Sequence, residues 1–157
     1  MATRNIIYSD NELIRKKSKP VKDFNESLWQ LLDDMRETMH ARNGCGIAAP
    51  QVGVLKQVVI VEVNNLYLEL INPEVIEELG EQESLEGCLS VKNSFQGYVN
   101  RPAQISVKAS DRYGDEFVIT GTGYLACALS HETDHLKGVL FIDKLLRPYS
   151  PESKGRK

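Results

Sequence analysis

His131-Glu132-Thr133-Asp134-His135 is the segment of this chain with the most specific chemistry. Its two histidines stand at positions i and i+4, so on a helix they point from one face and can bind one metal ion, with Glu132 beside the water of that ion. The segment falls within the run Gly123–Lys137, which is predicted to be a helix with Thr122 as its N-cap and Gly138 as the C′ glycine. We therefore expect a helix that carries a metal site.

A catalytic metal held by three protein ligands needs one more residue, and its position separates the classes of metalloenzyme. Metzincins continue the motif as His-x-x-Gly-x-x-His, and here Gly138 is in register but Phe141 takes the place of the third histidine. A glutamate further along would have to be Glu152, which follows a proline and is a poor place for a fixed ligand. The remaining histidine, His40, is expected near the end of an earlier helix, where it interacts with the helix dipole. A zincin-type endopeptidase is therefore disfavoured.

A cysteine is the alternative third ligand. Cys127 stands two turns before His135, and the helix rise separates these positions by roughly 12 Å, too far for both to reach one ion. Cys127 is therefore expected in the wall beside the metal. Cys45 and Cys88 both lie in loop-like, glycine-containing segments that could approach the helix. From the residues alone, both stay open as the third ligand.

The middle of the chain has the pattern of antiparallel strands. The runs 57–63 and 66–71 are β-branched or alternating, and Asn64-Asn65 between them indicates a hairpin. Asn72-Pro73 is predicted to form a turn before a further segment, 74–79. Two more strands, 105–109 and 116–120, are expected on either side of a turn at 111–115.

A second helix is predicted earlier in the chain, over Asp23–Asn43, with Asp23 and Glu26 as a capping box and Asn43-Gly44 at its end. Its apolar positions recur at helical spacing: Leu28, Leu31, Leu32, Met35 and Met39. After the metal helix, 139–142 is expected as a short strand or apolar anchor, and the chain from Arg147 as a frayed tail. The resulting prediction is one α+β domain over 1–147, in which antiparallel strands surround the metal-bearing helix after a long N-terminal helix, and a disordered tail over 148–157.

Composition excludes several classes of protein. The chain has 157 residues, 41% hydrophobic and 26% charged, which is typical of a globular domain rather than a disordered chain. A net charge of -3 argues against a protein that wraps nucleic acid. No apolar stretch approaches the ~20 residues of a membrane span, and the first residues lack a signal-peptide pattern. Three cysteines argue against a disulfide framework. A cytoplasmic protein is expected, with no membrane or specific nucleic-acid partner.

Three motifs together resemble one known family, the peptide deformylases. They are Gly44-Cys-Gly-Ile-Ala-Ala-Pro-Gln51, Glu86-Gly-Cys-Leu-Ser90 and the 131–135 segment, in the order that the family has them. The likeness extends over most of the chain. Three ordered motifs are far more specific than any one of them, since the first two alone would be unremarkable loops.

The resemblance implies the roles of individual residues. Cys88, His131 and His135 would bind a divalent metal, and Glu132 would act as general base and then acid. Gln51 and the backbone N–H of Leu89 would form the oxyanion hole, and Gly46 would help to hold the peptide backbone of the substrate. The implied reaction is hydrolysis of a formyl amide, which fits general chemistry for a metal, a base and oxyanion donors.

The resemblance also implies the cofactor and the partner. The native ion would be Fe(II), although a Cys-His-His set also suits zinc, nickel or cobalt in purified protein. The substrate would be N-formylmethionyl chains, with transient proximity to the ribosome. Helical spacing puts Tyr124, Cys127 and Ala128 on the metal-facing stripe, and in the family the adjoining groove receives the methionine side chain.

The sequence departs from the family pattern at a few positions. Ile47 replaces leucine in the first motif, Lys92-Asn93 stands where Pro-Gly is common, and Ser130 precedes His131 where glutamine is usual. These changes leave the expected metal ligands in place and put the loop after Ser90 in doubt. The non-enzymatic alternative is a metal-binding module without turnover. The presence of Gln51, Cys88 and Glu132 argues against it, because a structural metal site closes its fourth position and needs no base.

Overall fold

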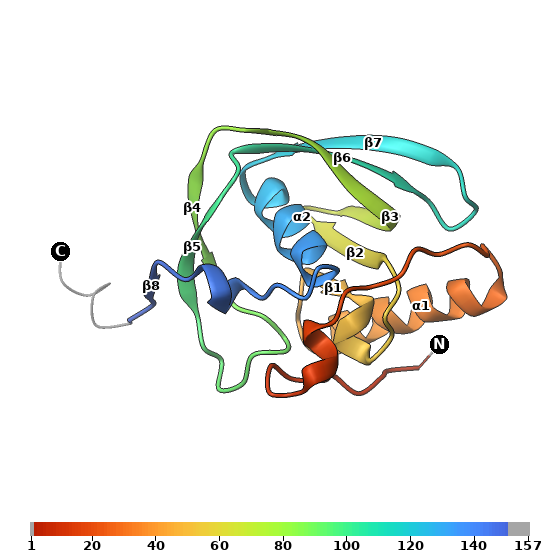
Figure 1. Cartoon of the computed structure of the whole chain (residues 1–157), viewed down its shortest axis with the longest axis horizontal. Helices are drawn as coiled ribbons and strands as arrows, with labels where there is room; N and C mark the ends of the chain where they lie inside the picture. Colours follow the sequence, from red (N-terminus) through yellow and green to blue (C-terminus); the bar gives the residue numbers. More distant parts are fainter. Residues whose placement is uncertain (1, 151–157) are drawn as a thin grey trace.

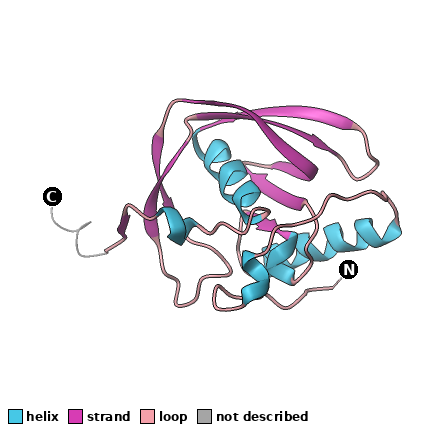
Figure 2. Cartoon of the chain, in the orientation of Figure 1, coloured by secondary structure: helices cyan, strands magenta, loops and turns pink. Residues whose placement is uncertain are grey.

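The helix that carries the two histidines packs against strands of two antiparallel sheets. In this computed structural model, which describes residues 2–150, α2 (Gly123–His135) contacts β1 and β2 on one side and β4 and β5 on another. The larger sheet has the strand order β1-β2-β3-β6-β7, and the smaller one has the order β4-β5-β8 (Figures 1 and 2). The predicted α+β class with antiparallel strands is confirmed. The strands are β1 (Gly46–Ala48), β2 (Val58–Val63), β3 (Leu66–Leu79), β4 (Gln82–Glu86), β5 (Gly97–Arg101), β6 (Gln104–Ser110), β7 (Glu116–Thr122) and β8 (Arg147–Pro148).

The two helices lie on opposite faces of β2. Successive side chains of a strand point to opposite faces of the sheet. Val58 and Ile60 belong to the apolar cluster around α1 (Glu26–Ala41), whereas Val59 and Val61 belong to the cluster around α2. All four side chains are fully buried, which explains why β2 has a continuous apolar sequence rather than an alternating one.

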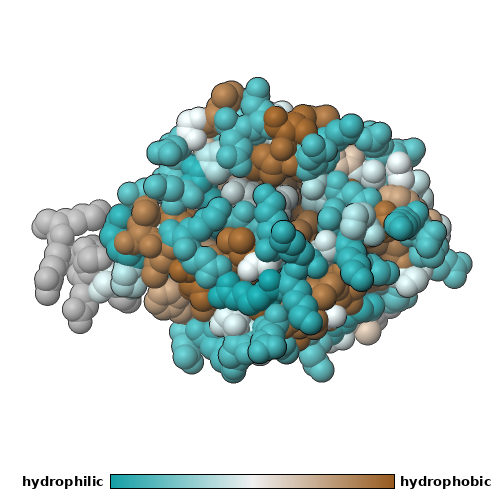
Figure 3. All heavy atoms as spheres, in the orientation of Figure 1, coloured by the Kyte–Doolittle hydropathy of each residue, from teal (hydrophilic) through white to brown (hydrophobic). Residues whose placement is uncertain are grey.

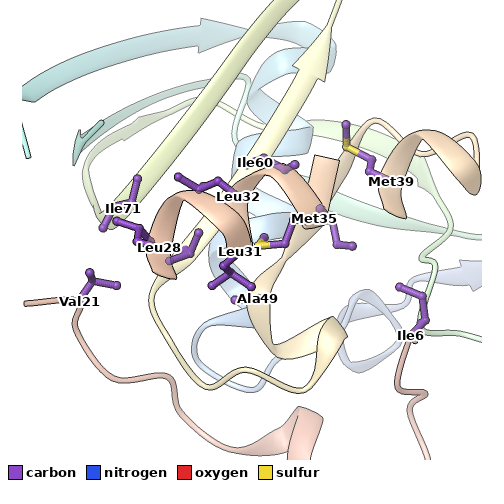
Figure 4. Close-up of a cluster of buried hydrophobic side chains, with 12 residues drawn as sticks. Ile6, Val21, Leu28, Leu31, Leu32, Met35, Met39, Ala49, Ile60 and Ile71 are labelled. Atoms are coloured by element: carbon purple, nitrogen blue, oxygen red, sulfur yellow. The ribbon is translucent and has the colours of Figure 1, made fainter. Parts of the chain in front are cut away.

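Helix α1 presents its predicted apolar stripe to the core (Figure 4). Its start differs from the prediction, because Asn25 and not Asp23 is the N-cap, and its side-chain oxygen accepts a hydrogen bond from the Leu28 N–H at 3.2 Å. Glu26 is consequently the first helical residue and cannot complete a capping box. The helix ends before Asn43, whose φ of 55° is the left-handed conformation expected there.

The predicted hairpin between β2 and β3 is confirmed. Asn64 and Asn65 have φ values of 52° and 67°, as a type I′ turn requires. The turn predicted at Asn72-Pro73 is wrong, because β3 continues through it with a register shift against β6. The Asn72 side chain explains this difference: it accepts from the Val21 N–H at 2.7 Å and donates to the Val21 carbonyl at 2.9 Å, so the N-terminal segment supplies the partners at the bulge.

Helix α2 begins as predicted and ends two residues earlier than predicted. Thr122 occupies the N-cap position without a capping side-chain hydrogen bond, and the last helical residue is His135 rather than Lys137. Gly138 has a φ of 77°, and a Cβ on it would collide with the carbonyl group of Arg15. A glycine is therefore required at this C-terminal turn. Among the described residues, neither helix is long and apolar enough to cross a membrane.

Within residues 2–150, three short 3-10 helices complete the fold. They are η1 (Glu12–Arg15), η2 (Ala49–Val52) and η3 (Phe141–Lys144). The segment 139–142 is an apolar anchor rather than a strand, since Leu140 and Phe141 are buried and η3 begins there. On the face seen in Figure 3, hydrophilic and hydrophobic side chains are interspersed.

The ordered fold extends beyond the point where a frayed tail was predicted to begin. Arg147 and Pro148 form β8 and pair with Tyr98 and Gly97 of β5. The Arg147 guanidinium also lies over the Tyr98 ring, 4.4 Å from its centroid. These contacts fix a segment whose prolines and charges resemble a linker. The rest of the predicted tail, 151–157, lies outside the described residues.

Candidate metal centre and catalytic groove

Cys88, His131 and His135 converge on one point. One ligand atom from each lies within 4.8 Å of the other two, and the Cys88 Sγ is 3.4 Å from the His135 Nε2. A thiolate and an imidazole bound to the same tetrahedral ion are roughly 3.6 Å apart, given the usual metal–ligand distances. His135 is fully buried and His131 nearly so. The donor set and its spacing therefore fit a divalent metal ion.

The structure separates the three cysteines. Cys88 follows β4 and reaches α2, where the i and i+4 histidines lie on one face. Cys45 precedes β1, and its thiol instead lies 3.0 Å from the Tyr124 hydroxyl. Cys127 is buried in the wall of the groove. Among residues 2–150, the Cys88 set is the one group of three or more potential ligands close enough to share a metal.

Glu86 holds His131 in orientation, and the sequence alone did not indicate this role. The His131 Nδ1 is 2.8 Å from a Glu86 carboxylate oxygen, which leaves Nε2 directed towards the other two ligands. Arg101 donates two hydrogen bonds to Glu86, at 2.7 and 2.9 Å. Burial by itself would raise the pKa of Glu86, but the bonds from Arg101 and His131 lower it to about 2. Glu86 is therefore an ionised, buried carboxylate.

Arg101 connects this carboxylate to helix α2. Its guanidinium donates to Asp134 at 2.8 Å and to the Ser130 hydroxyl at 3.2 Å, and its side chain is 1% exposed. Ser130, one of the departures from the family pattern, thus becomes part of the network. The sequence gives no local sign of this role, because the burial of Arg101 depends on tertiary packing.

Replacing Arg101 by methionine should destabilise the protein by on the order of 3 kcal/mol, because the buried carboxylate of Glu86 would lose both hydrogen bonds from its guanidinium partner. Urea unfolding monitored by circular dichroism measures this loss. Arg147→Met is the matched control, since Arg147 pairs with Glu83 and their side chains are 55% and 49% exposed. The control should cost much less than Arg101→Met, because an exposed ion pair contributes little to stability. Equal losses in the two variants would contradict the special role of Arg101.

Glu132 lies beside the three ligands and is held in a dry environment. Its Oε2 is 4.0 Å from the His131 Nε2, and its Oε1 has no hydrogen-bond partner among the described residues. Burial raises the pKa of this carboxyl to about 7. A Cβ on Gly46 would come within 2.5 Å of Oε2, so a glycine there lets β1 approach the carboxylate. An unpartnered carboxyl group in this position is suited to exchange a proton with a bound molecule.

Gln51 is fixed by hydrogen bonds at both ends of its amide. Its oxygen accepts from the Ala48 N–H at 2.9 Å, and its nitrogen donates to the Ser90 hydroxyl at 3.1 Å and approaches the Cys88 Sγ at 3.5 Å. The side chain is 1% exposed. The orientation of the amide is therefore set before any ligand binds, as an oxyanion donor requires.

A cavity of about 530 Å³ is lined by most of the site residues that the sequence singled out. His131, Glu132, Cys88 and Gln51 lie in its lining, whereas His135 lies behind it. The other lining residues named by the sequence analysis are Gly46, Leu89, Tyr124, Cys127 and Ala128. The structure thus brings together all ten residues of the predicted site.

Three comparisons with known proteins identify the same family as similar to this chain. The model of the family described as "Polypeptide deformylase" matches residues 3–150. The chain is 50% identical over 152 residues to the peptide deformylase of Caldicellulosiruptor bescii, covering 97% of this chain and 91% of that protein. Among solved structures, a peptide deformylase from Legionella pneumophila has a TM-score of 0.88 at 41% identity, covering 99% of this chain and 90% of the other.

A second solved structure contains a peptide. It is a Met-Ala-Ser-bound class I type b peptide deformylase from Acinetobacter baumannii, similar to this chain with a TM-score of 0.86 at 32% identity. The match covers 91% of this chain and 98% of the other.

Proposed function

The chain belongs to the polypeptide deformylase family, and on that basis we propose how its groove hydrolyses the formyl amide of N-formylmethionyl chains. The chain is an enzyme of this type: it removes the N-formyl group from newly made polypeptides and releases formate. The observation that supports the residue roles best is the convergence of Cys88, His131 and His135 beside Glu132 in a cavity.

Cys88, His131 and His135 would hold the metal. When bound, a divalent ion there supplies Lewis-acid chemistry: it polarises a carbonyl oxygen and lowers the pKa of a water molecule. Glu86 keeps the Nδ1 of His131 engaged, so that Nε2 remains the ligand atom. Family resemblance favours Fe(II) as the native ion, and zinc, nickel or cobalt would also suit a thiolate with two imidazoles.

Glu132 would move the protons of the reaction. Its carboxylate takes a proton from the water that attacks the formyl carbon, and then gives it to the nitrogen as the amide C–N bond breaks. The products are formate and a free amino terminus. Burial raises the pKa of Glu132 above that of an exposed carboxyl, which makes its carboxylate a better proton acceptor.

Gln51 and Leu89 would stabilise the negative charge on the formyl oxygen. The Gln51 amide is held at both ends, because its oxygen accepts from the Ala48 N–H and one of its N–H groups donates to Ser90. The other N–H, which faces the Cys88 Sγ, would turn to the oxyanion as charge develops. The backbone N–H of Leu89 would be the second donor, since Leu89 lines the same cavity directly after Cys88. Gly46 would contact the peptide backbone of the substrate from the β1 side.

The groove beside α2 would receive the first side chain of the substrate. The A. baumannii structure contains Met-Ala-Ser, and we infer that the same kind of peptide binds here. Tyr124, Cys127 and Ala128 line the cavity along the helix. Such substrates emerge from ribosomes, so we expect the enzyme to act in the cytoplasm close to the ribosome, without a specific nucleic-acid or membrane partner.

Formate release from formyl-Met-Ala-Ser by anaerobically purified protein tests the function, with metal content measured on the same sample. Formate should appear in step with a free amino terminus, and acetyl-Met-Ala-Ser should be a poor substrate. Cleavage of an internal peptide bond without formate release would instead favour an endopeptidase. Metal-loaded protein that releases no formate would overturn the proposed function.

Enlarging Ala128 to leucine should lower kcat/KM for formyl-Met peptides. The expected loss of transition-state stabilisation is about 1–3 kcal/mol, the scale of a methylene-sized change in an apolar pocket. Ala128 lies in the groove one helical turn before the metal ligands and leaves room for an unbranched thioether. A formyl-Ala peptide, whose side chain is shorter, is the internal control and should lose less. With metal content and stability matched to the parent, equal losses for both peptides would place the methionine pocket elsewhere.

A further inference from the structure

Lys144 is the outer member of a chain of ion pairs that ends on the metal ligand His131. Its Nζ lies 2.9 Å from the Asp134 Oδ2, and the same oxygen accepts a hydrogen bond from the Arg101 Nη1 at 2.8 Å. Arg101 binds Glu86 through its other two nitrogens, and Glu86 contacts the Nδ1 of the histidine. The exposed fraction of the side chains falls from 44% at Lys144 through 14% at Asp134 to 1% at Arg101. The ion-pair chain therefore connects the surface to the buried metal centre.

The short helix that ends at this lysine is itself held in place. It is η3, which lies against β5 (Figure 1) and begins at the buried Phe141, whose ring stacks on His131. The Asp143 side chain accepts a hydrogen bond from the Leu140 N–H at 2.9 Å and pairs with Arg15. Helix η3 therefore contacts the metal ligand directly at its first residue and through the ion-pair chain at its last.

Two carboxylates compete for the guanidinium of Arg101. Arg101 donates two hydrogen bonds to Glu86 and one to Asp134. Lys144 balances the charge of Asp134 from the solvent side. Without Lys144, Arg101 would be the one cationic partner of Asp134 among the described residues, and the guanidinium would be drawn away from Glu86. Such coupling is strong in a buried network, because charges there are poorly screened by water.

The position of Glu86 determines the orientation of His131. Its contact with the Nδ1 leaves the Nε2 directed towards Cys88 and His135. Loss of a group that orients a histidine ligand in this way typically lowers metal affinity by roughly 10–100-fold. A change at Lys144 reaches the histidine through three intervening residues, so its effect should be smaller but of the same kind.

We propose that Lys144 is a positioning residue of the metal centre, which acts through Asp134, Arg101 and Glu86 to keep the Nε2 of His131 directed at the metal. This inference rests on the proposed function, because it requires a metal ion at the site assigned above. Lys144 does not line the catalytic groove. It lines a separate cavity of about 230 Å³ on another face of α2, so its substitution leaves the substrate-binding surface unchanged.

The sign of the effect separates this role from a general effect of charge. Removing a positive charge near a bound cation favours metal binding by Coulomb's law, and so slows metal release. Loss of the positioning contact instead loosens the histidine and speeds release. Lys137→Met is the matched control, because Lys137 lines the same cavity, carries the same charge and forms no ion pair within residues 2–150.

The test measures, under anaerobic conditions and without turnover, the rate at which Co(II)-loaded protein loses cobalt to an excess of chelator. Lys144→Met should lose cobalt about three- to tenfold faster than the parent, below the effect of removing a group that contacts the ligand directly. The visible absorption bands of the bound cobalt, which report the geometry of its ligands, should shift in the same variant. Lys144→Arg keeps a cation beside Asp134 and should restore the parent rate and spectrum. In an Asp134→Asn background, Lys144→Met should have no further effect, because both changes act through one carboxylate.

Two results would overturn the inference on its own. One is a folded Lys144→Met protein that loses cobalt no faster than the parent or Lys137→Met. The other is a lower unfolding temperature of Lys144→Met with the parent release rate and spectrum, since Lys144 would then contribute to stability alone. If the parent itself binds no cobalt, the proposed metal site fails and the inference fails with it.

Discussion

Replacing Cys88 by alanine should remove most of the bound metal from anaerobically purified protein. Only two ligands, His131 and His135, would then remain, and a site with two imidazoles alone binds a divalent ion far more weakly than one with a thiolate. The fold should persist, because Cys88 lies in a loop and is partly exposed. Metal analysis by plasma mass spectrometry, together with far-UV circular dichroism, measures both quantities on one sample.

Cys45→Ala and Cys127→Ala are matched controls for the loss of a thiol in the same cavity. Cys45 bonds to Tyr124, and Cys127 lies in the wall, so both variants should retain metal at close to the parent stoichiometry. A folded Cys88→Ala protein with a full complement of metal would contradict the assignment. Loss of metal in Cys45→Ala instead would exchange the roles of the two cysteines.

The parts of the site and of the fold that could be predicted from the sequence depend on short-range geometry. His131 and His135 share a face because the helical repeat places i and i+4 together, whatever surrounds the helix. The Asn64-Asn65 turn was equally predictable, since asparagine tolerates the left-handed conformation that a type I′ turn needs.

The choice between Cys45 and Cys88 was open from the residues alone because it depends on tertiary structure. Both follow glycine in a short loop, and only the packing of β1 and β4 against α2 decides which thiol reaches the histidines. Family resemblance indicated Cys88, but this rests on the motif and not on local geometry. The Glu86–Arg101 pair was missed for a related reason. Its two members are 15 residues apart on neighbouring strands, and nothing in the local sequence reports that both are buried.

The loop after Ser90 was the part that the sequence left least defined, and the structure gives it an unusual backbone. Asn93 and Ser94 have φ values of 66° and 52°, so two consecutive residues other than glycine are left-handed. The loop is held at its end by Phe95, whose ring stacks on Phe141 with 6.2 Å between centroids. Phe141 in turn stacks on His131, at 6.0 Å. Long-range aromatic contacts of this kind stabilise a conformation that local propensity does not predict.

The same aromatic and ionic contacts hold one metal ligand, His131, in orientation. His131 is contacted on its Nδ1 by Glu86 and on its ring face by Phe141. Gln51 is held by Ala48 and Ser90. Glu132, by contrast, has a carboxylate oxygen without a partner among residues 2–150. His131 and Gln51 are therefore held in orientation, and the side chain proposed to transfer protons is left available.

Changing Glu132 to glutamine should therefore leave the fold and the metal in place while reducing kcat for formate release by about 10²–10⁴, the range typical of a lost general acid–base group. Glutamine has the same shape and cannot take up a proton at neutral pH. Because Oε1 has no partner to lose, the substitution should have little effect on the free energy of unfolding. Steady-state formate release at matched metal content measures the effect, with thermal unfolding recorded alongside.

Glu83→Gln is the matched control for Glu132→Gln, since Glu83 forms an exposed ion pair with Arg147 on the smaller sheet. The control should turn over formyl-Met-Ala-Ser at close to the parent rate. A Glu132→Gln protein that keeps its metal and retains near-normal kcat would refute the proton-transfer role. In that case the attacking water would have to be activated without a carboxylate, and the buried position of Glu132 next to Gly46 would have only a packing role.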